Sequence, residues 1–290
     1  MITLSNGYSF EFMAASGALA FDGRGWPWEW PLRWMGLLRP ELFTIVTKSL
    51  TLHPKKGNLR WWHPFACVRF IPGGVVNAVG LTNPGIDWWI KKKYRQIEKS
   101  NWNFIVSISG EHLQEYMEMA VRLQNCTALK ALEINASCPN SPGELQNNAQ
   151  AVIDTVQALK YVTKWPLILK LSCTHDYLKI AKALEGTVEA ISINSVPWSA
   201  AFPDKKSPLA RFGGGGVSGK SVQRRNWKMV AELAQNTKVP VIGSSVWNYT
   251  DLIDLFGFGA KAIAFGSIFL RYPWRPTLFV KRWRQSQKSG

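Results

Sequence analysis

The chain has 290 residues, of which 46% are hydrophobic, so it can form one large α/β barrel or two smaller domains with a real core. No stretch approaches the roughly 18 apolar residues that a membrane-spanning helix needs. Lysine and arginine outnumber aspartate and glutamate, which gives a formal net charge of +16. Composition therefore excludes a transmembrane protein and leaves the positive charge to be explained.

The positive charge is dispersed, with small clusters such as Lys91-Lys92-Lys93 and Arg224-Arg225. We favour a soluble basic enzyme that acts on an anionic substrate. Nucleic-acid binding is not expected, because it needs a contiguous basic face and a recognisable module. Weak peripheral association with an anionic membrane surface is the third interpretation.

The cysteines and histidines predict neither disulfides nor a metal site. The cysteines have no paired spacing, and the N-terminus has no basic region followed by an apolar run, so we expect reduced thiols in a cytoplasmic protein. The histidines lack the spacing of metal ligands, and we expect no metal. These residues are Cys67, Cys126, Cys138 and Cys173, and His53, His63, His112 and His175.

Residues 2–10 begin the chain with the pattern of a short β-hairpin. Asn6-Gly7 is a typical two-residue turn for such a hairpin. We expect the hairpin to cap the bottom of the barrel described below.

Fifteen tryptophans are many for this length, and four of them fall within residues 26–34. Pro27 and Pro31 argue against a regular helix through the middle of this run. We favour a packing role for the segment, as a lid or a dimer contact. A membrane-surface anchor is the alternative, because tryptophan and basic residues suit that interface.

Short apolar runs that end in polar or glycine residues alternate with segments of helical period. This alternation predicts parallel strands, and eight of them fit a closed (β/α)8 TIM barrel better than an open sheet. No linker divides the chain, so we expect a single domain over residues 1–290. The expected strands are residues 11–16, 44–48, 103–109, 131–137, 166–172, 190–195, 239–244 and 262–267, and the expected helices include 111–125, 149–163, 176–184, 220–236 and 249–256.

The most informative segment is residues 133–140, with the sequence Glu-Ile-Asn-Ala-Ser-Cys-Pro-Asn. It begins as a buried strand and turns abruptly polar, at the strand end where α/β proteins bind ligands. The carboxamides of Asn135 and Asn140 suit a planar heterocycle that carries both N–H and C=O groups. Pro139 favours an extended backbone at Cys138.

This segment resembles the signature of the dihydroorotate dehydrogenase family. Other similar segments follow in the family's order, between roughly residues 9 and 270: residues 13–17, 47–52, 57–58, 77–85, 170, 194–195, 215–219 and 266–267. The resemblance implies a flavoprotein that binds FMN and oxidises dihydroorotate to orotate in pyrimidine biosynthesis. Cys138 is similar to the soluble class, whose members are dimers, so a homodimer is expected; the membrane-bound, quinone-using class has serine there and an N-terminal extension.

The resemblance also implies which residues hold the cofactor. Lys48 and Lys170 are expected to contact the flavin, with Lys170 stabilising the anionic reduced ring. The phosphate is expected on backbone N–H groups of glycine-rich turns between strands and helices. The expected cofactor-binding residues are Ala15, Ser16, Gly17, Lys48, Ser49, Asn135, Lys170, Gly216, Gly219, Gly243, Ser244, Ser245, Gly266 and Ser267.

For the substrate, the resemblance implies amides around the orotate ring and a backbone segment at its carboxylate. Cys138 is the expected general base for the C5 proton, and Lys48 lies between flavin and substrate. Because a free thiol has a pKa of about 8.5, activity should rise with pH in the alkaline range. The expected substrate-binding residues are Asn77, Val79, Gly80, Leu81, Asn135, Asn140, Asn194 and Ser195.

Two departures from the family pattern bear on function. Where the family has two adjacent glycines after the seventh strand, this chain has Gly243-Ser244-Ser245 and is one residue shorter. Serine adopts positive φ less readily than glycine, which puts tight flavin binding in question. Residues 59–64, Leu-Arg-Trp-Trp-His-Pro, replace the family's prolines and arginine and suggest altered entry to the site or an altered electron acceptor.

Three alternatives stay open at this point. The first is an FMN oxidoreductase of the same fold that acts on another cyclic amide or enone. The second is a flavin-free barrel that has lost catalysis and serves as a binding protein. The third is a peripheral membrane form. Nothing in the sequence separates fumarate from an iron–sulfur flavoprotein subunit as the electron acceptor.

Overall fold

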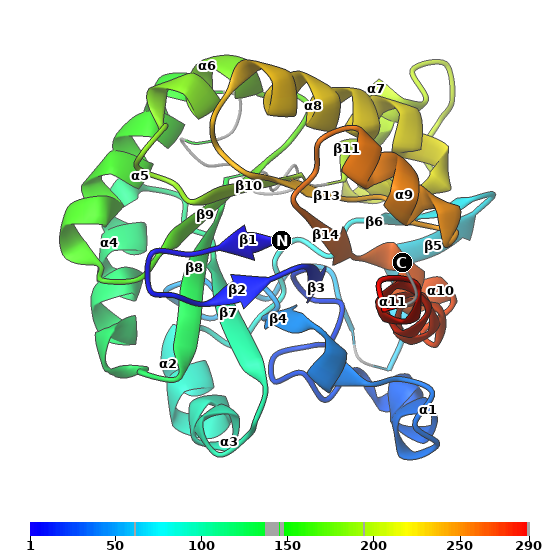
Figure 1. Cartoon of the computed structure of the whole chain (residues 1–290), viewed down its shortest axis with the longest axis horizontal. Coiled ribbons are helices and arrows are strands. Elements are labelled where there is room, and N and C mark those ends of the chain that lie inside the picture. Colours follow the sequence, from blue (N-terminus) through cyan, green and yellow to red (C-terminus); the bar gives the residue numbers. More distant parts are fainter. Residues whose placement is uncertain (61, 137–144, 146–147, 194, 289–290) are drawn as a thin grey trace.

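The computed structural model describes residues 1–60, 62–136, 145, 148–193 and 195–288. Within these residues, parallel strands close into a barrel in the order β10-β13-β14-β3-β4-β7-β8-β9, which confirms the expected TIM barrel (Figure 1). Each expected strand corresponds to one barrel strand: β3 (Phe12–Ala14), β4 (Thr44–Val46), β7 (Asn103–Ile108), β8 (Leu129–Asn135), β9 (Leu167–Leu171), β10 (Ala190–Ile193), β13 (Val241–Gly243) and β14 (Ala262–Phe265).

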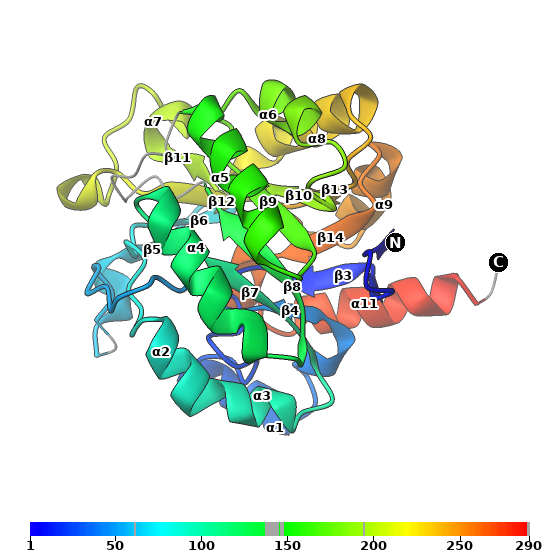
Figure 2. The same ribbon diagram turned by 90° about the vertical axis from the view of Figure 1, so that its left-hand side faces the viewer.

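Helices surround the barrel, and their apolar faces pack against its outer surface (Figures 1 and 2). Local capping fixes two of the helix starts. The side chain of Asn148 accepts a hydrogen bond from the N–H of Ala151, and Asp176 accepts one from Lys179. The expected helices correspond to α4 (Leu113–Arg122), α5 (Ala149–Val162), α6 (Tyr177–Ala183), α8 (Gln223–Asn236) and α9 (Thr250–Gly257).

The other helices are shorter or irregular, apart from the C-terminal one. None of the helices in the described residues is both long and apolar enough to cross a bilayer. They are α1 (Trp30–Trp34), α2 (Ile86–Trp89), which continues through the π-helix η4 (Ile90–Tyr94) into α3 (Arg95–Glu98), α7 (Trp198–Ala201), α10 (Ser267–Arg271), α11 (Arg275–Ser286), and the 3-10 helices η1 (Pro27–Glu29), η2 (Pro40–Leu42), η3 (Pro64–Ala66), η5 (Leu123–Asn125), η6 (Ala210–Phe212) and η7 (Lys220–Val222).

The expected N-terminal hairpin is present and closes the bottom of the barrel. Strands β1 (Ile2–Thr3) and β2 (Ser9–Phe10) pair antiparallel across a turn in which Gly7 has a φ of +80°. Ile2, Leu4 and Phe10 pack into one apolar cluster with residues from the barrel interior. A ligand cavity must therefore form at the opposite end.

An antiparallel sheet lies across that opposite end, and the sequence did not predict it. It pairs β11, β12, β6 and β5 in this order. Because these strands are short and lie inside the expected loops, the βα alternation conceals them. Their bounds are β5 (Val68–Ile71), β6 (Gly74–Asn77), β11 (Val196–Pro197) and β12 (Gly216–Gly219).

Most of the glycine-rich segment 215–219, expected as a turn between a strand and a helix, is itself a strand of this sheet. Residues Gly216–Gly219 form β12, which pairs with β6 outside the barrel, and the predicted helix follows as η7 and α8. The glycines here allow close packing of the two strands. Gly215 has a φ of +80°, and a Cβ at this position would lie 2.6 Å from the carbonyl oxygen of Asn77.

Candidate functional site

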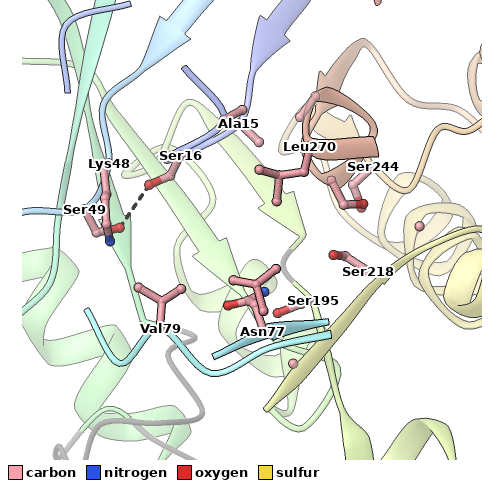
Figure 3. Close-up of a pocket in the computed structure, with 18 of the residues that line it drawn as sticks. Ala15, Ser16, Lys48, Ser49, Asn77, Val79, Ser195, Ser218, Ser244 and Leu270 are labelled. Carbon is pink, nitrogen blue, oxygen red and sulfur yellow. Dashed lines mark hydrogen bonds between the residues drawn. The ribbon is translucent and has the colours of Figure 1, made fainter. Parts of the chain in front are cut away.

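A cavity of about 500 Å³ lies between the carboxyl ends of the barrel strands and the β5–β6–β12–β11 sheet (Figure 3). Its volume is in the range of natural small-molecule sites. Most residues that the sequence predicted for the site line this one cavity. They are Ala15, Ser16, Gly17, Lys48, Ser49, Asn77, Val79, Gly80, Leu81, Asn135, Lys170, Ser195, Gly216, Gly219, Ser244, Ser245, Gly266 and Ser267.

Four predicted site residues are not among them. Gly243 is buried within β13, where a Cβ would lie 2.9 Å from the side chain of Leu255, so its place in the fold is explained by packing against α9. Cys138, Asn140 and Asn194 lie outside the described residues. In the rest of the chain, no group of three or more His, Cys, Asp or Glu side chains could hold a metal ion.

Two buried lysines give the cavity its positive charge. Lys48 follows β4 and is 9% exposed, and Lys170 on β9 is 7% exposed. The Lys170 ammonium forms an ion pair with the buried carboxylate of Glu133, with Nζ and Oε1 3.8 Å apart. Ser192 donates a hydrogen bond of 3.3 Å to the other oxygen of Glu133. The ion pair is longer than a hydrogen bond, so Lys170 can also donate to a ligand in the cavity.

A chain of hydrogen bonds orients Asn135 at the end of β8. Its Nδ2 donates to Ser49 Oγ at 2.9 Å, and Ser49 Oγ lies 3.0 Å from Ser16 Oγ (Figure 3). The Ser16 hydroxyl donates to the carbonyl of Thr47, so Ser49 must donate to Ser16 and can accept from Asn135. The protein itself therefore sets the orientation of this carboxamide before any ligand binds.

The predicted substrate loop after β6 is held in a defined conformation by two asparagines. Asn58 donates from Nδ2 to the carbonyl of Ala78, and from its backbone to the carbonyl of Val79. Asn83 Nδ2 donates to the carbonyl of Leu81, which has a φ of +55°. Such a conformation in a leucine is strained and needs the surrounding structure to hold it. The backbone of this loop thus lies at the cavity in a fixed shape.

Ser244 and Ser245 form a turn after β13, here called the serine turn, which has the left-handed conformation that favours glycine. Ser245 has a φ of +65°. Side chains of α8 hold it, because Asn226 Nδ2 donates to Ser245 Oγ and Gln223 Nε2 donates to the Ser245 carbonyl, each at 2.8 Å. Trp227 Nε1 donates to the carbonyl of Ser244 at 3.0 Å. The left-handed cost of about 1–2 kcal/mol is comparable to what these bonds contribute at about 0.5–1.5 kcal/mol each.

This turn is also tied to α9 through Asp251. The Asp251 carboxylate accepts hydrogen bonds from the backbone N–H groups of Trp247 and Asn248, and from Gln223 Nε2 at 2.6 Å. Gln223 therefore connects the serine turn and the start of α9. The departure from the family's glycines has local compensation in this chain.

Two tryptophans of the segment 26–34 form another part of the cavity wall. Trp26 and Trp28 stack with their ring centroids 5.5 Å apart, and Trp26 Nε1 donates to the carbonyl of Gly17 at 3.0 Å. The prolines lie at the starts of η1 and α1, where a missing N–H is tolerated. The segment thus packs at the site; its role as a dimer contact stays a prediction.

Glu29 anchors this segment from inside. Its side chain is fully buried, its Oε2 accepts a hydrogen bond of 2.7 Å from the N–H of Trp26, and its Oε1 has no hydrogen-bond partner within the described structure. Burial raises the pKa of Glu29 to about 8, although the bond from Trp26 partly opposes this. The carboxyl is therefore largely protonated at neutral pH.

Comparison with known proteins assigns the chain to a family. The family model for dihydroorotate dehydrogenase matches residues 36–276. This chain belongs to the dihydroorotate dehydrogenase family. A relative from Bacteroides thetaiotaomicron, the catalytic subunit of dihydroorotate dehydrogenase B (NAD(+)), is 32% identical over 230 residues, which are 77% of this chain and 74% of that protein. The protein of the same name from Geotalea uraniireducens is 34% identical over 234 residues, covering 78% and 75%.

A solved structure gives the same result for the fold. The crystal structure of ligand-free type DHODH from Eimeria tenella superposes with a TM-score of 0.72 and covers 97% of this chain and 84% of that one. The two sequences are 15% identical, so this comparison shows the shared fold alone.

Several residues of the site were not predicted from the sequence. The sequence around Gln223 and Asn226 predicts the polar face of a helix. It gives no sign that these side chains form hydrogen bonds with the serine turn. Trp26 and Trp28 stood out by composition, but the contact of Trp26 with Gly17 and its stacking on Trp28 depend on the path of the loop. The family resemblance identifies positions that this chain shares with the family, and these residues are not among them.

The serine turn can be tested by changing one residue in two ways. Ser245→Ala removes the hydroxyl that Asn226 binds and keeps a Cβ at positive φ, so it should lower the free energy of unfolding by about 1–3 kcal/mol. Ser245→Gly removes the same hydroxyl and relieves the backbone, so it should be more stable than Ser245→Ala by about 1 kcal/mol. Urea unfolding of both variants measures this difference. Equal stability of the two would show that the turn is not strained.

The protonation of Glu29 predicts a pH dependence of stability. The raised pKa of Glu29 means that the folded protein retains a proton that the unfolded chain releases near its ordinary pKa. The stabilisation of the folded state by this bound proton is therefore complete below about pH 4.5. It is lost as the pH rises towards 8, by at most about 1.4 kcal/mol for each unit by which the pKa is raised.

Glu29→Gln carries a neutral amide and should escape that loss. Its free energy of unfolding relative to the unchanged protein should rise by a few kcal/mol between pH 5 and pH 8. Urea titrations at the two pH values measure this, with Glu41→Gln, an exposed carboxyl in η2, as the matched control. An equal effect of the two substitutions at both pH values would contradict the assignment.

Proposed function

We propose that this protein oxidises dihydroorotate to orotate in pyrimidine biosynthesis, with FMN as its cofactor. The observation that carries the proposal is the match of the dihydroorotate dehydrogenase model to residues 36–276, joined to a cavity whose wall holds the matching residues. The curated relatives are named as catalytic subunits of dihydroorotate dehydrogenase B (NAD(+)). The region aligned with this chain covers about three quarters of each relative's length.

The cavity suits a flavin with a phosphate tail. Lys170 places a buried cation at the strand ends, where it would favour the anionic reduced ring. Ser244 Oγ is buried at the cavity and has no hydrogen-bond partner in the described structure, so it can donate to a phosphate oxygen. Gly266 and Ser267, at the start of α10, add backbone N–H groups. When bound, FMN would accept the hydride from C6 of the substrate.

The remaining wall offers the groups that a dihydroorotate ring needs. Asn77 and Ser195 point into the same part of the cavity, and Asn135 is oriented by Ser49 (Figure 3). Amide and hydroxyl groups can bind the N–H and C=O groups of the ring. The backbone of residues 79–81 would receive the carboxylate, and the Lys48 ammonium would lie between ring and cofactor. Asn140 and Asn194 are proposed as the other amides from sequence alone.

Cys138 is the proposed proton acceptor in this reaction. As a general base, its thiolate would take the C5 proton while the hydride leaves from C6, so both hydrogens and one electron pair are accounted for. The assignment rests on the sequence resemblance, since Cys138 lies outside the described residues.

The electrons must then leave the cofactor. The relatives are named as catalytic subunits of NAD(+) enzymes, and we propose by analogy that a separate iron–sulfur flavoprotein subunit receives the electrons here. Fumarate is the competing acceptor. A homodimer and a cytoplasmic location are proposed on the same analogy.

The visible spectrum of the purified protein tests the core of the proposal. We expect a flavin absorption band that bleaches when dihydroorotate is added without oxygen. A band that stays oxidised would assign the protein to another substrate, and the absence of a band even after reconstitution with FMN would falsify the enzyme proposal. Reoxidation with fumarate, with NAD and with quinones then distinguishes the acceptors.

The role of Cys138 gives a sharper kinetic prediction. Cys138→Ala should keep the flavin spectrum and slow anaerobic bleaching by about 10²–10⁴-fold, because proton transfer from C5 loses its acceptor. In the unchanged protein, the bleaching rate should increase with pH towards the pKa of a free thiol, about 8.5. Cys173→Ala is the matched control and should bleach at the normal rate. Normal bleaching by Cys138→Ala would remove this residue from the mechanism.

A further inference from the structure

Beside the cavity, the segment 24–39 exposes an unusual amount of apolar surface. Its exposed side chains come from η1, α1 and the turn after α1, and Trp34 is 78% exposed. Soluble proteins rarely leave neighbouring large apolar side chains in water unless the surface contacts something. We call this surface the tryptophan face. Its exposed apolar residues are Trp28, Trp30, Trp34, Met35 and Leu37.

The tryptophan face has a fixed shape. The indole N–H of Trp30 donates to the carbonyl of Gly25, and that of Trp26 donates to Gly17. The N–H of Met35 donates to the carbonyl of Pro31, which closes the turn of α1. These hydrogen bonds, two from indole N–H groups and one from the backbone, fix the path of the segment that carries the exposed apolar side chains.

Within segment 24–39, the exposed charged side chains are all basic. Between Asp22 and Glu41 the sequence contains a single acidic residue, Glu29, and that side chain is fully buried. Arg24 and Arg39 are exposed, and Arg39 Nε lies 3.7 Å from the exposed carboxylate of Glu41 just beyond the segment. The face thus presents tryptophan, methionine, leucine and arginine, and its one carboxyl is withdrawn from the surface.

A second basic segment lies at the same end of the molecule as the tryptophan face. In both views α1 and α3 lie at the same end of the molecule (Figures 1 and 2). Lys93 in η4 binds the buried carboxylate of Asp22 at 2.7 Å, and this contact joins η4 to the chain that leads into the face. Lys91 and Lys92 of the same helical segment are exposed. The positive surface therefore extends beyond the tryptophan face.

We propose that the tryptophan face docks the protein peripherally on an anionic lipid bilayer. Tryptophan prefers the membrane–water interface, where its apolar ring and its N–H are both accommodated. The surrounding cations and the net charge of +16 are complementary to anionic headgroups. Protein interfaces share the enrichment in tryptophan, methionine and arginine, so a second copy of the chain is the competing occupant that the test below separates.

Docking in this way brings the cavity close to the bilayer. Trp28 belongs to both surfaces, because it lines the cavity and is half-exposed on the tryptophan face. Phe65 and Phe70 line the cavity as well, and both are exposed. The apolar rim of the cavity is thus continuous with the tryptophan face.

Vesicle flotation with the purified full-length protein tests this proposal. The protein should float with vesicles of phosphatidylcholine mixed with phosphatidylglycerol, and more weakly with phosphatidylcholine alone or at high salt. The double variant Trp34→Ser/Met35→Ser should bind the anionic vesicles about tenfold more weakly, because it removes two apolar side chains from the face. Arg24→Gln/Arg39→Gln should weaken binding to anionic vesicles and leave the weak neutral binding unchanged.

Matched measurements keep the test decisive. Tyr161→Ser removes an aromatic side chain that is 91% exposed on α5, and it should float like the unchanged protein. The Trp34→Ser/Met35→Ser variant should keep its thermal transition and its flavin absorption. Absence of flotation on anionic vesicles would overturn the proposal, as would normal flotation of the double variant. If the unchanged protein does not float, and light scattering gives it a larger molecular mass than the Trp34→Ser/Met35→Ser variant, the face would be assigned to contact with a second copy of the chain.

Discussion

The site depends on one pairing, in which the first barrel strand meets the last. Strand β3 joins β14 in parallel, with Ala14 opposite Phe265, and the sheet has no free edge at this point. Closure brings Ala15 and Ser16 next to Gly266 and Ser267, although some 250 residues separate them in sequence. Without this pairing, the two ends of the cavity wall would not meet.

The charge of Lys170 is balanced before any ligand binds. Lys170 is paired with Glu133, and Glu133 is held by Ser192, so a buried cation is tolerated beneath the cavity. The hydroxyl groups of Ser49 and Ser16 form a hydrogen-bonded chain that orients the amide of Asn135. The polar groups thus hold one another in place, which reduces the reorganisation that a bound ring would have to cause.

The barrel and much of its wall could be predicted from the sequence, because each depends on local pattern. A strand such as β8 ends where apolar residues give way to Asn135, and strand ends of a parallel barrel share one face. The sheet over the cavity could not be predicted in this way. Its strands β6 and β12 meet through pairing of Gly216 with Asn77, which is a contact between distant loops. The same holds for the reach of Asn226 to Ser245, which depends on how α8 is rotated.

The serine turn has a consequence for how this chain can vary over evolutionary time. The positive φ of Ser245 is offset by hydrogen bonds from Gln223 and Asn226, and only the bond from Asn226 uses the serine side chain. A return to glycine would remove the hydroxyl that Asn226 binds, whereas Gln223 would still donate to the backbone carbonyl and to Asp251. Positions 226 and 245 should therefore change together among close homologues, an epistatic pair in which the history of one residue restricts the options of the other.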